Sequence, residues 1–194
     1  MKIELLYVAI YSYMFGSIPF GLILTKIFLK KDIREIGSGN IGATNVLRTG
    51  KKFLGVATLL LDTFKGYFSV VITLNFFPEH VYLSALLCFL GHVFPVWLKF
   101  KGGKGIAVYL GVLFAISTNL TLIFAITWVI ILFFSKYSSL SSILSTLIIL
   151  MYSIFLDSFN ISIFFFIIFV IVLYTHRENI SRIKDKTENK ISFL

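Results

Sequence analysis

Residues 53–77 have the sequence FLGVATLLLDTFKGYFSVVITLNFF. As a helix, this stretch is long enough to cross the hydrocarbon core of a bilayer, which needs about 20 mainly apolar residues. Asp62 and Lys65 interrupt it three positions apart, on one helix face. Ionisable groups at membrane depth suggest a functional role. Alternatively, the two neutralise each other, or Asp62 holds a basic loop residue in place.

The composition of the whole chain agrees with a membrane protein. Of its 194 residues, 58% are hydrophobic and 14% are charged, and 22 are Phe. The mean hydropathy is +0.93. Soluble domains are about 45–50% apolar and about 25% charged, so the composition argues against a water-soluble single domain and excludes a disordered chain. The single Cys88 excludes a disulfide framework and a cysteine-rich metal site.

Apolar runs follow one another along the chain. Turn and cap residues separate them, including Asp157 and Ser158 before the last run. We interpret the N-terminal run as a first span rather than a cleaved signal, because it lacks a basic start and a small-residue cleavage site. We therefore predict an all-α integral membrane protein with one transmembrane domain over residues 1–194. The seven runs cover residues 3–29, 53–77, 81–98, 105–117, 120–135, 142–156 and 159–175.

The basic residues predict the orientation. With seven spans and the N-terminus outside, every Lys and Arg lies on the inside except Lys2, Lys26 and Lys65. The positive-inside rule favours this arrangement, with a cytoplasmic C-terminus. The net charge of +9 thus indicates membrane topology, and we predict no nucleic-acid partner. Five spans with re-entrant segments are the alternative.

A glycine-rich run, residues 37–45, follows the first apolar run, with Arg48 beyond it. It matches a dinucleotide-binding glycine pattern formally, but no strand precedes it, and Ala43 stands where a P-loop needs lysine. Glycines still let backbone amides approach an anion, and Arg48 adds a bidentate donor. The run therefore suggests a phosphate site, with a plain polar loop as the alternative.

A lysine-rich turn, residues 101–105, lies on the same predicted side. Lys101 and Lys104 flank two glycines at the start of an apolar run, which would place cations and free amides at a helix N-terminus. A positive-inside anchor would have the same composition.

Two further polar groups lie on the same predicted side of the membrane. His176 and Asn179 share a helix face just inside the last run, and Ser138–Ser142 is rich in hydroxyls. A solvated helix end and helix capping are the plain alternatives. The sequence contains neither a nucleophile elbow nor a metal-binding His/Cys cluster, so we expect no covalent intermediate on the protein, no metal and no cofactor. This combination of polar groups fits a site where a phosphorylated polar substrate meets a lipid substrate.

The motifs, taken in order, resemble a known family. They are Gly16–Gly21 with Lys26, Gly37–Arg48, Lys101–Gly105 and His176–Asn179. Together they resemble the bacterial acyl-phosphate-dependent glycerol-3-phosphate acyltransferases, the PlsY family, over about residues 12–182. The resemblance implies a seven-helix enzyme of the bacterial inner membrane with its active site on the cytoplasmic side.

The resemblance also implies the reaction and the roles of residues. A fatty acyl group would pass from acyl phosphate to the 1-hydroxyl of sn-glycerol 3-phosphate, giving lysophosphatidate and phosphate in the first acylation of phospholipid synthesis. Glycerol 3-phosphate would be bound by Ser38, Arg48, Lys104 and Asn179. Acyl phosphate would be bound by Gly39, Asn40, Gly42, Thr44, Asn45, Ser142 and His176. The expected catalytic residues are His176, Lys104 and Asn179.

The partners would be the two substrates, membrane lipids and, as a candidate, a peripheral enzyme that forms acyl phosphate. The attacking hydroxyl must lose a proton, either to His176 or to a substrate phosphate oxygen, and we favour the phosphate. Two other classes stay open from the residues alone. A phosphometabolite transporter would show anion flux without product, and a non-catalytic membrane subunit would be inert by itself.

Overall fold

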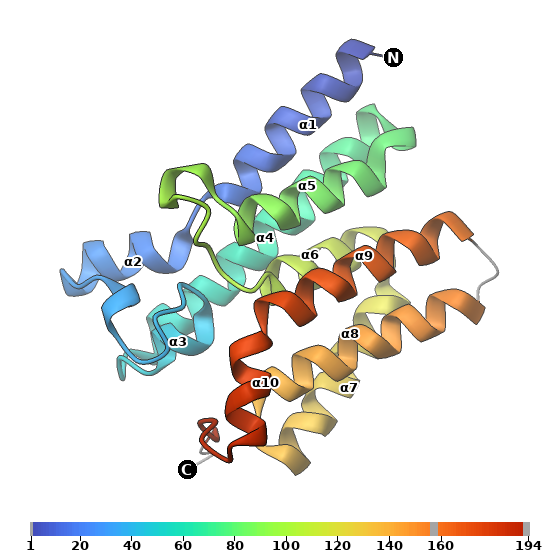
Figure 1. Ribbon diagram of the computed structural model, residues 1–194. Coiled ribbons are helices and arrows are strands. Elements are labelled where there is room, and N and C mark those ends of the chain that lie inside the picture. The colour runs from blue at the N-terminus through green and yellow to red at the C-terminus, as the bar shows by residue number, and fades with distance from the viewer. Residues whose placement is uncertain (1, 156–158, 192–194) are drawn as a thin grey trace. The chain divides into compact units, whose positions relative to one another are not determined.

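The computed structural model describes residues 2–155 and 159–191, and these are helical without strands (Figure 1). The expected turn at Asp157 and Ser158 lies outside the described residues. Where the structure describes them, the seven apolar runs are mainly helical. The elements are α1 Lys2–Ser17, α2 Phe20–Leu29, η1 Ile33–Glu35, α3 Ala43–Leu47, α4 Lys52–Phe76, η2 Pro78–His80, α5 Val81–Val93, η3 Val96–Leu98, α6 Ile106–Ile116, α7 Thr118–Ser135, α8 Ser138–Phe155, α9 Phe159–Thr175 and α10 Arg177–Lys184.

The helices are long and apolar enough to cross a membrane in five places within the described residues. A sixth span results if α9 and α10, which meet at a 57° bend, form one unit. These spans agree with an integral membrane protein, whereas seven spans and the orientation stay predictions. The candidate spans are Lys2–Leu29, Lys52–Phe76, Pro78–Leu98, Thr118–Ser135 and Ser138–Phe155.

Helix α6 is the shortest of the predicted spans. Its 11 residues extend about 16 Å at 1.5 Å per residue, about half of the 30 Å hydrocarbon core. The run over residues 105–117 therefore forms a helix that does not reach across a bilayer by itself.

Two compact units make up the chain, Met1–Ile116 and Ser117–Leu194. In the first unit, α4 contacts α1, α2, α3, α5 and α6. In the second, α8 packs between α7 and α9, and α10 contacts both α8 and α9. One transmembrane domain over residues 1–194 stays a prediction.

Close backbone contacts hold the helices of the first unit together. A Cβ atom on Gly16 of α1 would lie 1.9 Å from the carbonyl oxygen of Cys88 in α5. A Cβ atom on Gly111 of α6 would lie 1.9 Å from the carbonyl oxygen of Thr63 in α4. Glycine is required at both positions, as is common where membrane helices pack through small residues.

The first apolar run is broken at Pro19. Proline lacks an N–H group and disfavours helix at the residue before it, so α1 ends at Ser17 and α2 begins at Phe20. Trp97 of η3 donates its indole N–H to the carbonyl oxygen of Ser17 at 3.1 Å. The break is therefore tied to the segment that leads into the lysine-rich turn.

Candidate active site

Asn45 holds the glycine-rich loop from the inside. Its side chain is 2% exposed, and its Oδ1 accepts from the backbone N–H of Ser38 at 2.9 Å. Its Nδ2 donates to the carbonyl oxygens of Ile33, Ile36 and Asn40 at 3.1, 2.9 and 2.8 Å. The side chain is thus engaged with the loop backbone, and a direct contact of Asn45 with acyl phosphate stays a prediction.

The loop presents other predicted side chains to its surface. Ser38, Thr44 and Arg48 are exposed. Gly37 has a φ of +58°, which favours glycine, and a Cβ there would lie 3.1 Å from Cδ of Arg48. The Arg48 side chain therefore lies directly against the loop that it was predicted to serve.

The glycines of the loop mainly determine the conformation of its backbone. Gly39 has a φ of +69°, and its N–H donates to the carbonyl of Ile36 at 3.0 Å. The N–H of Gly42 donates to Oδ1 of Asn40 at 2.9 Å. Binding of acyl phosphate by Gly39, Asn40 and Gly42 stays a prediction, and the structure gives these residues a part in forming the turn.

Arg34, which lies near Arg48 in the sequence, already has a carboxylate partner. Its guanidinium donates to both oxygens of Asp32, at 2.9 and 2.6 Å. The hydrogen bonds from Arg34 hold the pKa of the Asp32 carboxyl below its ordinary value. The positive charge of Arg34 is balanced in this way, which leaves Arg48 as the better anion donor of the two.

The lysine-rich turn differs from the expectation in one respect. The amides of Gly102 and Gly103 donate to the carbonyls of Val93 and His92, both at 3.0 Å. The prediction that these amides are free for an anion is wrong, because they satisfy the last carbonyls of α5 instead. Lys104 follows directly, half-buried at the start of α6.

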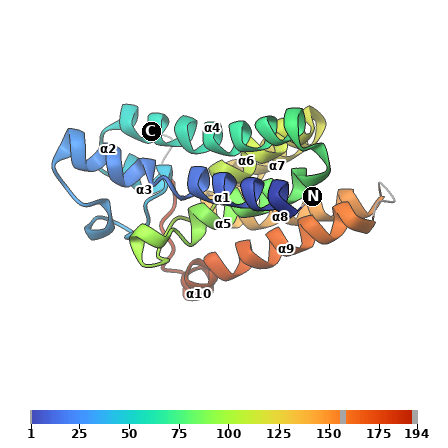
Figure 2. The ribbon, with the colours of Figure 1, turned by 90° about the horizontal axis from the view of Figure 1, so that it is seen from above.

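The glycine-rich loop and the segment that leads into the lysine-rich turn share one core. Leu98 of η3 packs against a buried cluster to which both α2 and the loop contribute. Figures 1 and 2 show the two segments at the same end of the first unit. Ser38, Arg48 and Lys104 are therefore carried by neighbouring segments. The cluster consists of Leu22, Ile33, Ile41, Val46 and Leu54.

In the second unit, His176 lies at the bend between α9 and α10. It is 2% exposed, and its Nδ1 lies 2.8 Å from the carbonyl oxygen of Val172. A carbonyl can only accept, so Nδ1 carries the proton and Nε2 carries the lone pair of the neutral ring. The ring therefore has the tautomer that a base acting through Nε2 requires.

Asn179 is held by a residue that the sequence analysis missed. Glu188 accepts at Oε1 from Asn179 Nδ2 at 2.6 Å and from Ser139 Oγ at 2.8 Å, and at Oε2 from Arg182 Nε at 2.8 Å. Burial acts to raise the pKa of Glu188, but the three hydrogen bonds outweigh it and the pKa lies below its ordinary value. An acid among the basic residues of the tail, which also holds Glu178 and Asp185, was the only sequence signal for this cluster.

Ser142 is buried in α8, 3% exposed. Its Oγ donates to the carbonyl of Ser138 at 2.8 Å and accepts from Trp128 Nε1 at 3.1 Å. Ser142 thus belongs to the second unit with His176 and Asn179, and Lys104 to the first. That the two groups form one site stays a prediction.

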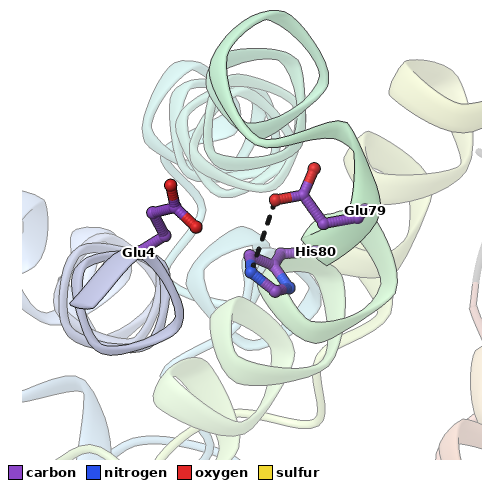
Figure 3. Close-up of side chains that lie close together, drawn as sticks. All are labelled: Glu4, Glu79 and His80. Atoms are coloured by element: carbon purple, nitrogen blue, oxygen red, sulfur yellow. Dashed lines mark ion pairs between the residues drawn. The ribbon is translucent and has the colours of Figure 1, made fainter. Parts of the chain in front are cut away.

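Two other features lie outside the predicted residues. A groove of about 490 Å³ lies between the end of α2 and the start of α4, lined by Phe28, Leu29, Gly50, Lys51, Lys52, Phe53 and Leu54. The ligand atoms of Glu4, Glu79 and His80 lie within 4.8 Å of one another at the α1 end that carries the N-terminus (Figure 3). Within this group, His80 Nε2 lies 3.5 Å from Glu79 Oε1. Nothing in the described residues indicates what these three side chains would bind.

Comparisons with known proteins place the chain in a family. The model of the family described as "Glycerol-3-phosphate acyltransferase" matches residues 6–186. A glycerol-3-phosphate acyltransferase of Pelagibacter ubique is 58% identical over 96% of this chain and 97% of the relative. One of Mesorhizobium japonicum is 49% identical over 98% of both chains.

The solved structures agree. The crystal structure of PlsY (YgiH), an integral membrane glycerol 3-phosphate acyltransferase in its glycerol 3-phosphate form, superposes with a TM-score of 0.91. The identity is 36%, over 97% of this chain and 96% of that one. The lysophosphatidic acid form superposes with a TM-score of 0.87. With its all-helical fold and its paired polar loops, this chain is an acyltransferase that belongs to the glycerol-3-phosphate acyltransferase (PlsY) family.

Proposed function

We propose that this protein transfers a fatty acyl group from acyl phosphate to the 1-hydroxyl of sn-glycerol 3-phosphate. The products are lysophosphatidate and inorganic phosphate, and the reaction takes place at the cytoplasmic face of the bacterial inner membrane. The proposal is supported by one observation: Leu98, just before the lysine-rich turn, packs against the same buried cluster as residues flanking the glycine-rich loop, and Arg48 and Lys104 belong to one compact unit. Two cations from separate segments suit the binding of an anionic substrate.

The chemistry needs no nucleophile from the protein, because acyl phosphate is already activated. The substrate hydroxyl oxygen attacks the acyl carbonyl carbon, the new C–O bond forms, and the bond from that carbon to the phosphate oxygen breaks. The hydroxyl proton leaves with the phosphate. The protein contributes by holding two anions side by side and offsetting their repulsion.

Within this scheme, Ser38, Arg48, Lys104 and Asn179 bind glycerol 3-phosphate. Ser142, His176, Thr44 and the glycine-rich loop bind acyl phosphate. His176 is oriented by the hydrogen bond that its Nδ1–H donates to the Val172 carbonyl. Nε2 is then an acceptor in the neutral ring and donates to a phosphate only when the ring is protonated. We assign proton removal to the leaving phosphate rather than to His176.

The test uses the protein purified in detergent with palmitoyl phosphate and glycerol 3-phosphate, and follows phosphate release. Acyl-CoA is run alongside as donor. We expect turnover with palmitoyl phosphate alone. Equal turnover with acyl-CoA would refute the donor assignment, and no lysophosphatidate from either donor would refute the function.

Lys104→Ala should raise the KM for glycerol 3-phosphate by tens of fold, because a hydrogen bond to a charged group contributes about 1.5–3 kcal/mol. Lys101→Ala is the matched control, since it removes an equal charge from an exposed position in the same turn. If both variants raise KM equally, Lys104 acts through general electrostatics and not as a ligand.

His176→Ala tests the proton acceptor. A general base typically contributes about 10²–10⁴-fold. We expect a loss below about a thousandfold, since the ring would position acyl phosphate rather than take the proton. A larger loss in kcat with substrate binding intact would assign the base to His176.

A further inference from the structure

Three buried ionisable residues lie between α4 and α5, outside the residues proposed for the reaction. Asp62, Lys65 and His92 are 1%, 2% and 4% exposed. The Lys65 Nζ lies 2.9 Å from Asp62 Oδ1 and 2.9 Å from His92 Nδ1. Burying an ionisable side chain costs free energy. Asp62 and Lys65 carry opposite charges and would neutralise each other without His92. The third member therefore needs its own explanation.

The hydrogen bond from Lys65 determines the state of the histidine. An ammonium group can only donate, so His92 Nδ1 accepts and the ring proton lies on Nε2. That side of the ring lies against the lysine-rich turn. A Cβ atom on Gly103 would lie 2.1 Å from His92 Nε2, and the next two nearest atoms also belong to the ring. The His92 carbonyl accepts the Gly103 amide at 3.0 Å.

His92 thus contacts Gly103 through both its ring and its backbone. Gly103 is buried and directly precedes Lys104. The peptide from which the Lys104 side chain projects is therefore fixed by His92, whose ring is in turn fixed by Lys65.

Lys65 also reaches the segment that carries the glycine-rich loop. Its Nζ donates to the carbonyl of Ile18, in the break between α1 and α2, at 2.6 Å. Helix α2 lies against the loop, because a Cβ on Gly21 would lie 1.9 Å from the carbonyl oxygen of Ile41. One ammonium group thus forms an ion pair with Asp62 on α4 and hydrogen bonds to His92 on α5 and to Ile18 at the α1–α2 break.

We propose that Lys65 and His92 are positioning residues for glycerol 3-phosphate. Lys65 orients the His92 ring, and the ring holds Gly103 so that the Lys104 ammonium meets the substrate phosphate at a fixed place. The inference rests on the proposed function, in which Lys104 binds that phosphate. It predicts a defect in substrate affinity that is separate from any loss of stability.

The first test removes the network at nearly constant volume. Asp62→Asn combined with Lys65→Met deletes both charges together, a kind of change that buried pairs often tolerate. We expect the KM for glycerol 3-phosphate to rise by about tenfold while kcat changes much less, because the lost interaction positions the substrate. The KM for palmitoyl phosphate should change less than that for glycerol 3-phosphate.

The control variant targets a different contact between the same two helices, α4 and α5. Ser69 Oγ in α4 and Ser84 Oγ in α5 are buried and 3.1 Å apart. Ser84→Ala removes a polar link between α4 and α5 without touching the lysine-rich turn. It should lower thermal stability and leave KM unchanged.

A second test uses the contact between the ring and Gly103. Gly103→Ala should raise KM, because its methyl group overlaps the His92 ring. Adding His92→Ala removes this overlap together with the ring that holds the turn, so the KM of the double variant should fall to that of His92→Ala alone, which lies above the wild-type value. If the double variant is as impaired as Gly103→Ala, the ring is not what displaces the turn, and the proposal is wrong.

The outcomes are distinguishable from failure of the proposed function. A wild-type protein that does not acylate glycerol 3-phosphate removes the function itself. An active wild type with an unchanged KM in the double charge variant, whether or not stability falls, overturns the positioning role. Should that variant not fold, His92→Asn removes the ring while keeping an acceptor for Lys65, and an unchanged KM there is equally decisive.

Discussion

Asn45→Asp tests whether Asn45 acts by holding the glycine-rich loop. The change keeps the shape and the acceptor for the Ser38 amide, but it replaces Nδ2 by an oxygen that faces three carbonyl oxygens at 2.8–3.1 Å. An unsatisfied buried acceptor costs about 1–3 kcal/mol. The two lost N–H donors served three acceptors, so we expect a destabilisation of about 2–4 kcal/mol. At about 2–4 °C per kcal/mol for a chain of this size, Tm should fall by roughly 5–15 °C.

Asn40→Asp is the matched control, because Asn40 uses only its Oδ1, which accepts the Gly42 amide at 2.9 Å. An aspartate keeps that bond and adds the same negative charge to the same loop. Unfolding can be followed through Cys88, the only cysteine in the sequence, which is 0% exposed and reacts with a thiol dye when the first unit opens. If the two variants melt within about 2 °C of each other, Asn45 does not hold the loop and its side chain is available for a ligand.

Three further predictions concern other parts of the chain. Gly111→Ala places a methyl group against the Thr63 carbonyl, and since backbone cannot step aside we expect a loss of about 1–3 kcal/mol, measured as a lower Tm. Glu188→Gln should destabilise the second unit by about 1–3 kcal/mol at pH 7, because the charged acceptor of three donors is lost. The folded pKa of Glu188 lies below its ordinary value of 4.5. The wild type should therefore be more stable than Glu188→Gln by the full amount above pH 4.5, and the difference in stability should disappear as the pH falls through the folded pKa. A difference that grew in acid would contradict this assignment. Cys88 should resist a membrane-permeant maleimide in the folded protein and react fully in denaturant, as seen by mass spectrometry.

Much of the fold could be predicted because its signals are local. Apolar runs and turn residues placed the helices, and the spacing of Asp62 and Lys65 predicted a pair that the structure shows at 2.9 Å. The break in the first run lies at Pro19, as the missing proline N–H requires. The number of spans could not be settled in this way, because the apolar run over residues 105–117 does not show that its helix, α6, has only 11 residues and is too short to cross a bilayer by itself.

The candidate site was harder to predict, because its supports are distant in sequence. A polar residue in a glycine-rich loop suggests a ligand, yet Asn45 is buried and bonds to carbonyls up to 12 positions away. His92 meets Lys65 across two helices, 27 positions apart. Glu188 lies beyond the motifs that carried the resemblance. Which side chains face a substrate and which hold those that do is decided by tertiary contacts.

The docking of the C-terminal segment has a practical consequence for handling the protein. The Ile191 amide donates to the Lys136 carbonyl at 2.9 Å, and Lys190 lies over the Tyr137 ring. A chain that ends before Glu188 would lose the hydrogen bond between Glu188 and Asn179, and with it the contacts of Lys190 and Ile191 with Tyr137 and Lys136. An affinity tag is therefore safer after a flexible spacer than in place of the final residues. Poor substrate affinity in a truncated enzyme would be explained by the loss of the support for Asn179, with the other binding residues intact.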